Sequence, residues 1–117
     1  MKPDDTAEKL PGTFKEFCRR FPDLGRLHQE TGEALKAAGP LDAKQCELIK
    51  VGMCVGAGLE SALRSHVHRA MKHGATEAEV EHAILLGMTT CGFPATARAW
   101  SWARVQFERE RAESRNG

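Results

Sequence analysis

The sequence predicts an all-α protein with about five to six helices and no β-strand of useful length. Two observations predict this class. Apolar residues recur at helical spacing over segments of helix length. Glycine and proline residues interrupt the chain between those segments, as they commonly do at helix ends. Each interruption therefore marks the expected end of one helix.

The first half of the chain is expected to form three helices. A short helix over residues 14–21 is interrupted by Pro22, which is also well placed to open the second helix. The second helix is expected to end at the Gly–Pro pair at positions 39 and 40. A third helix is expected over residues 43–57.

The second half is expected to form three more. A glycine joint at position 58 precedes a fourth helix over residues 59–73. Thr76 and Glu79 have the spacing of a capping box, which predicts a fifth helix that runs to about residue 88. Pro94 then opens a last helix that is expected to reach about Arg111.

Length and charge restrict both the organisation and the partners. With 117 residues the chain fits one domain, expected over residues 13–117 after a flexible N-terminal arm at residues 1–12. The net charge is +1 with both signs interspersed, so no nucleic-acid partner is expected. No apolar run approaches the ~20 residues of a membrane span, so no membrane partner is expected either.

The four cysteines indicate a reducing compartment. Cys18, Cys46, Cys54 and Cys91 show no CxxC spacing, and the first residues lack the apolar stretch of a signal peptide. We therefore expect reduced thiols and a cytoplasmic location. Thiol chemistry is disfavoured, because Cys54 lies in apolar company and Cys91 at a helix C-terminus, where the dipole opposes a thiolate.

Glu47 is the first candidate for chemistry. It lies on the third helix, where Lys50 is the single charged residue between positions 49 and 57. A helix that is apolar around most of its circumference is surrounded by protein, and a carboxylate there is costly unless it is paired or protonated. The alternatives are an ion pair with Lys50 and a polar site, and the apolar surroundings favour the polar site.

His66 is the second candidate, because imidazole is the side chain best suited to proton transfer near neutral pH. His68 lies two positions further on and points to a different face, so the two histidines do not form a metal pair. A metal site would need ligands from elsewhere, and no metal is expected.

Glu60 is the third candidate, and two interpretations of it weigh equally. It is either a functional acid or the partner of an ion pair with Arg64, one helical turn later.

The last helix bears on assembly. Trp100, Ala103 and Phe107 are expected to share the face that meets the core, whereas Trp102 is rotated by about 200° from Trp100. We expect Trp102 to meet a second subunit, with the alternative that it covers a neighbouring helix of the same chain.

The chain resembles the carboxymuconolactone decarboxylase-like family within the alkylhydroperoxidase D-like superfamily. The resemblance covers about residues 40–103 and rests on the segments Glu47-Leu48-Ile49, Gly58-Leu59-Glu60, His66-Val67-His68-Arg69-Ala70, Gly74-Ala75-Thr76-Glu77-Ala78-Glu79-Val80 and Gly92-Phe93-Pro94-Ala95. It implies a compact orthogonal helical bundle that assembles into homotrimers or homohexamers.

One departure from the alkylhydroperoxidase D branch changes the expected chemistry. That branch carries CxxC shortly before its histidine, and the two positions are Leu59 and Ala62 here. The glutamate and histidine of its proton relay match Glu47 and His66. Peroxide reduction through a disulfide is therefore not expected.

The decarboxylase branch also lacks CxxC, and Glu60 and His66 match its acidic residue and its histidine. The resemblance implies a cofactor-free lyase for a small carboxylated lactone or related acid. His66 would supply the proton and Glu47 or Glu60 would orient it, while Ser65, Arg64 and Arg69 are the candidate substrate-binding residues. Two alternatives stay open: a non-catalytic oligomeric protein that binds a small ligand, and a peroxidase that uses an unpaired cysteine such as Cys54.

Overall fold

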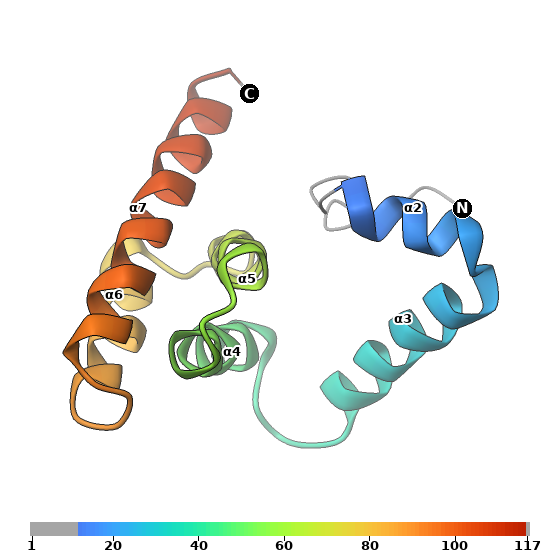
Figure 1. Ribbon diagram of the computed structural model, residues 1–117, viewed down its shortest axis with the longest axis horizontal. Coiled ribbons are helices and arrows are strands. Elements are labelled where there is room, and N and C mark those ends of the chain that lie inside the picture. The colour runs from blue at the N-terminus through green and yellow to red at the C-terminus, as the bar shows by residue number, and fades with distance from the viewer. Residues whose placement is uncertain (1–11, 117) are drawn as a thin grey trace. The chain divides into compact units, whose positions relative to one another are not determined.

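The computed structural model describes residues 12–116 (Figure 1). Every regular element among them is a helix, so the predicted all-α class is confirmed. The chain divides into two units, with the boundary between Asp42 and Ala43. None of the described helices is both long enough and apolar enough to cross a bilayer.

The first unit is a helical hairpin of α2 (Gly12–Arg20) and α3 (Pro22–Ala37). Pro22 stands at the start of α3, where its missing N–H breaks no helical hydrogen bond. Gly25 is buried, and a Cβ at this position would lie 2.8 Å from Cys18 Sγ. Glycine therefore lets the two helices approach each other closely.

The second unit contains α4 (Ala43–Ala57), α5 (Glu60–Lys72), α6 (Glu77–Leu85), the 3-10 turn η1 (Leu86–Met88) and α7 (Phe93–Asn116). α4 packs against α5, α6 and α7, and α5 also packs against α7. The helices share one apolar core, whose fully buried large side chains are Val51, Val55, Leu63, Val67, Val80 and Ile84.

The joints between these helices follow the sequence signals. Gly58, Gly74 and Gly92 have φ values of +70°, +97° and +100°, which side chains with a Cβ rarely adopt. The capping box before α6 is present: Glu79 N donates to Thr76 Oγ1 at 3.0 Å, and Thr76 N donates to Glu79 Oε1 at 2.9 Å.

Two expected helix ends differ from the structure. The fifth helix tightens into η1 after Leu85, and α7 continues to Asn116 instead of ending near Arg111. The expected flexible arm at residues 1–12 lies outside the described residues, except for Gly12, which begins α2. The single domain over residues 13–117 stays a prediction.

The assignment of the two tryptophans was wrong. Trp102 packs against the core, and the Arg98 guanidinium lies 5.2 Å from the centre of its ring, whereas Trp100 is 37% exposed. Trp100 Nε1 instead donates to Glu81 Oε2 at 2.8 Å. The two indoles flank the buried stripe of α7 on opposite sides, so the helical angle alone did not decide which one reached the core.

Candidate functional site

The site begins with a buried acid. Glu47 lies on the face of α4 that also carries Val51 and Cys54, and the residue is only 2% exposed. The apolar neighbours that drive this helix into the core take the carboxylate with them. A carboxylate in such a position needs a partner, because burial without one costs several kcal/mol, roughly 2–7 for a polar group.

The partner of Glu47 is His66 on α5, and not Lys50. His66 Nδ1 and Glu47 Oε1 lie 2.7 Å apart, a distance typical of a charge-assisted hydrogen bond. The His66 side chain is 18% exposed, against 3% for that of Glu47. The pair therefore has a buried acidic end and a partly exposed imidazole end.

The electrostatics keep Glu47 ionised. Burial raises the pKa of its carboxyl, but the hydrogen bond from His66 and the positive charges of His66, Arg69 and Lys50 lower it by more. The net result is a pKa below the ordinary value of 4.5. A Glu47 carboxylate accepts a hydrogen bond and cannot donate one, so the hydrogen of this contact belongs to His66 Nδ1. The Nε2 atom is then the ring position that faces other groups.

Arg69 adds a cation beside this pair. It follows His66 by three residues on α5, so the two side chains share a face of the helix. Arg69 Nε is buried, and within residues 12–116 no hydrogen-bond partner satisfies it. Its charge is one of those that lower the pKa of Glu47.

Arg64 and Glu60 instead satisfy each other. Arg64 Nη1 donates to Glu60 Oε2 at 2.5 Å across one turn of α5. The Glu60 side chain is 48% exposed, and no contact joins it to His66 among the described residues. The structure therefore places Glu47, His66 and Arg69 together and leaves Glu60 and Arg64 as a separate surface pair. Ser65 directly precedes His66 in the sequence, and its side chain is partly buried.

A further pair on α5 was not anticipated. His68 is 8% exposed, and its Nδ1 atom lies 2.8 Å from Glu110 Oε2 on α7. Sequence reasoning set His68 aside because it points away from His66. Its partner lies 42 residues further along the chain, and no local spacing connects the two.

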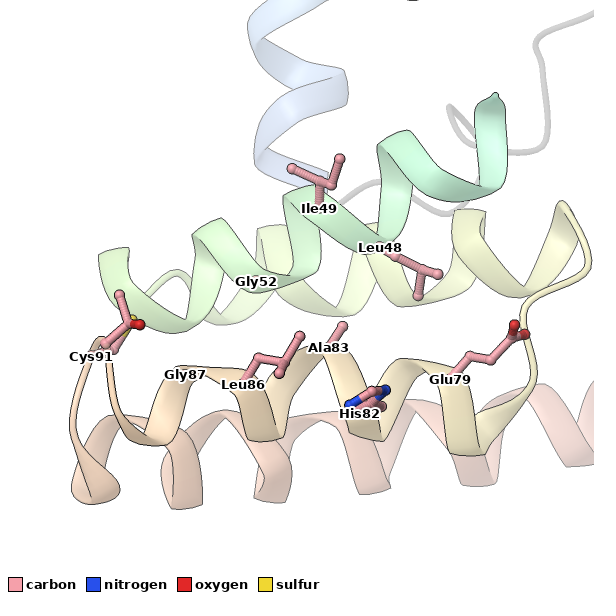
Figure 2. A pocket seen from close by; sticks show the side chains of 10 residues that line it. Leu48, Ile49, Gly52, Glu79, His82, Ala83, Leu86, Gly87 and Cys91 are labelled. Atoms are coloured by element: carbon pink, nitrogen blue, oxygen red, sulfur yellow. The ribbon is translucent and has the colours of Figure 1, made fainter. Parts of the chain in front are cut away.

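A cavity of about 440 Å³ opens between α4 and α6 (Figure 2). Figure 2 shows Leu48, Ile49 and Gly52 of α4 opposite Ala83 and Leu86, with Glu79 near one end and Cys91 at the other. The remaining lining residues are His82, Gly87 and Thr90. His66 does not line this cavity, so the cavity and the Glu47–His66 pair are different places.

The family model for the carboxymuconolactone decarboxylase family matches residues 22–105. The chain belongs to the carboxymuconolactone decarboxylase family. The matched span includes Glu47, His66 and Arg69, and family membership confirms the resemblance drawn from the sequence. A search of curated proteins gave no significant match.

Proposed function

We propose that this member of the carboxymuconolactone decarboxylase family is a cofactor-free lyase that acts on a small carboxylated lactone or a related acid. The observation that carries the proposal is the 2.7 Å contact between the buried Glu47 carboxylate and the partly exposed His66 side chain. Orienting a histidine by a buried acid is a recurrent way to prepare an imidazole for proton transfer.

In the proposed reaction the C–C bond to the carboxylate breaks and CO2 leaves. The electron pair of that bond stays on the substrate as an enolate, which then takes a proton from His66 Nε2. Glu47 stabilises the imidazolium before this step and fixes the ring through Nδ1. The neutral ring that results recovers its proton from water, so the cycle needs no oxidant or reductant.

Arg69 is the proposed partner of the substrate's charged group. Its buried Nε lacks a hydrogen-bond acceptor, whereas the guanidinium of Arg64 already has Glu60. A guanidinium binds a carboxylate through two parallel hydrogen bonds, so an anionic ligand would satisfy Arg69 and lie close to His66. Ser65 is a further candidate contact on the same helix.

Assembly into a homotrimer or homohexamer is also proposed, and the apolar surface of the second unit supports it. The side chains of Met53, Leu86 and Phe93 are each more than 60% exposed, and Ile49 is 44% exposed. Large apolar side chains in such numbers are typical of a surface that another subunit covers.

One observation favours a second candidate function, a non-catalytic protein that binds a small ligand. The cavity between α4 and α6 has a largely apolar wall, and His66 is not among its lining residues.

The third alternative, a thiol peroxidase, receives little support from Cys54. Cys54 is 4% exposed, and burial raises the pKa of its thiol, which disfavours the reactive thiolate.

The test is a thermal-shift screen of small carboxylic acids and lactones, followed by measurement of CO2 release for each hit. It uses wild type, His66→Gln, and, as the matched control, His73→Gln at the exposed C-cap position that follows α5. Binding at a hundredfold excess over Kd adds ~2.7 kcal/mol, a shift of several degrees for a domain of this size.

The lyase proposal expects CO2 release by wild type and His73→Gln, and a loss of about a hundredfold or more in His66→Gln. Turnover that is equal in all three proteins would contradict the role of His66. Stabilisation by a ligand that produces no CO2 in any of the three would support the binding function instead.

A further inference from the structure

A second group of ligand-type side chains lies outside the Glu47–His66 site, where α5 meets the C-terminal half of α7. One ring nitrogen of His68 and one carboxylate oxygen each of Glu110 and Glu113 all lie within 4.8 Å of one another. We propose that His68, Glu110 and Glu113 bind a divalent transition-metal ion, and that Zn²⁺ is the ion the three ligands suit best.

The ligand types select the ion. An imidazole nitrogen with two carboxylate oxygens suits zinc, whereas magnesium and calcium favour oxygen ligands alone. Zinc bonds to these atoms are about 2.0–2.2 Å long, so its ligand atoms lie about 3–4 Å from one another. Zinc binding would therefore open the 2.8 Å contact between His68 Nδ1 and Glu110 Oε2 and close the wider separations, of up to 4.8 Å, through rotation of the exposed Glu113 side chain. Three protein ligands leave a fourth position for water.

The backbone already holds these ligands in place. Glu110 and Glu113 are separated by one turn of α7, so their carboxylates project from the same face. His68 comes from α5, which packs directly on α7, and it is 8% exposed. Two helices from distant parts of the sequence therefore supply the ligands from fixed positions.

A buried amide also orients one carboxylate. Gln106, which is 8% exposed, donates from Nε2 to Glu110 Oε2 at 2.6 Å. The same oxygen lies 2.8 Å from His68 Nδ1. Hydrogen bonds of this kind to a ligating carboxylate are a regular part of protein metal sites, because they fix the direction of its lone pairs.

The state of the His68 ring is compatible with metal binding. Its Nε2 atom is buried and has no partner within the described part of the chain, so Nδ1 is the nitrogen directed at the carboxylates. Zinc binding through Nδ1 requires the neutral ring to carry its single proton on Nε2, so the Nδ1 proton moves to Nε2 or, from an imidazolium, leaves to solvent, and the Nδ1 lone pair goes to the metal.

The competing explanation is a purely structural network, in which His68, Gln106 and Glu110 join α5 to α7. The contacts of His68 and Gln106 in that network run to Glu110, whereas the metal site also needs the carboxylate of Glu113. The charge of Glu113 therefore distinguishes the two explanations. Because Glu113 is exposed, Glu113→Gln is expected to fold as wild type does.

The experiment is a calorimetric titration of the reduced 117-residue protein with ZnCl2. Wild type is compared with Glu113→Gln and with the matched control Glu108→Gln, which removes an exposed carboxylate from the same helix. Long-range ¹H–¹⁵N spectra of the histidine rings report which ring nitrogen binds the ion. This second readout separates the proposed site from binding to a cysteine or another histidine.

The proposal expects wild type and Glu108→Gln to bind zinc with equal affinity, with the Nδ1 resonance of His68 shifting as the site fills. It expects Glu113→Gln to bind about tenfold or more weakly, since a ligating carboxylate is lost. Three results would each overturn it: no saturable binding to wild type, equal affinity in Glu113→Gln, or His68 resonances that do not move at saturating zinc.

Discussion

Glu47 Oε1 on α4 and His66 Nδ1 on α5 meet at 2.7 Å, and the two ends of this contact have different access to solvent. Glu47 is enclosed by the apolar face of α4, while the ring of His66 is still partly exposed. Glu47 can thus hold the imidazole in one orientation without blocking the exposed part of the ring. Both helices need their core residues to form this contact, so the pair is a product of the fold and not of local sequence.

The first prediction concerns the pH dependence of stability. The pKa of Glu47 is lower in the folded protein than its ordinary value of 4.5, so the unfolded chain takes up the proton first as the pH falls. Glu47 therefore stabilises the fold above the unfolded pKa, and this contribution is lost as the pH falls through the folded pKa.

Glu47→Gln is expected to lower the free energy of unfolding by about 1–3 kcal/mol near neutral pH, because a hydrogen bond between charged groups is lost. Urea denaturation of both proteins from neutral pH to about pH 3 checks this, and the difference should shrink with acidification. A difference that stays constant or grows as the pH falls would contradict the lowered pKa.

Much of this fold could be predicted because its helix ends carry local signals. Gly58, Gly74 and the capping box of Thr76 and Glu79 each act through their own backbone, so a few neighbouring residues suffice to locate them. The position of Trp102 could not be found in this way. Its burial depends on which neighbouring helix covers the flank of α7.

The site was predictable only in part for the same reason. Glu47 stands out in the sequence because its neighbours are apolar, but its partner lies on another helix. The choice between Arg64 and Arg69 also needed the structure. Both lie on α5. Only the three-dimensional arrangement shows that Arg64 is paired with Glu60, while Arg69 Nε lacks a hydrogen-bond acceptor within residues 12–116.

The second prediction separates those two arginines. Arg69→Gln is expected to raise the pKa of Glu47, because the Arg69 charge is one of the causes that lower it. Arg64→Gln is expected to leave that pKa nearly unchanged, because the Arg64 charge is already paired with Glu60. The Glu47 carboxyl ¹³C resonance followed against pH measures both effects. A larger change in Arg64→Gln would show that the assignment of Arg69 to the site is wrong.

The third prediction uses two glycines of the second unit as a matched pair. A Cβ on the buried Gly87 would lie 2.9 Å from Val55 Cγ1 and 3.2 Å from Thr96 Oγ1. Val55 is fully buried and has no room to move, so Gly87→Ala is expected to cost about 1–3 kcal/mol. A Cβ on Gly52 would meet nothing closer than Ala83 O at 3.9 Å.

Gly52→Ala is therefore expected to be neutral or to stabilise by up to ~1 kcal/mol, since alanine is the better helix former in α4. Denaturant unfolding of both variants against wild type measures the two changes. Equal destabilisation by the two substitutions would contradict the open space found beside Gly52 within the second unit.

The last prediction concerns the thiols. Cys54 lies in the core and is 4% exposed, and burial raises the pKa of its thiol, so both access and nucleophilicity are low. Cys91 is exposed at the end of the cavity between α4 and α6.

A thiol reagent is expected to modify Cys91 at the rate that is usual for an exposed thiol. It is expected to modify Cys54 about a hundredfold more slowly, because that reaction requires the structure to open. Peptide mass mapping of the labelled protein identifies each site, and Cys91→Ser serves as the control for the fast phase. Rapid modification of Cys54 in the native protein would reopen the peroxidase alternative, because it would show a thiolate that the apolar core of the second unit does not suppress.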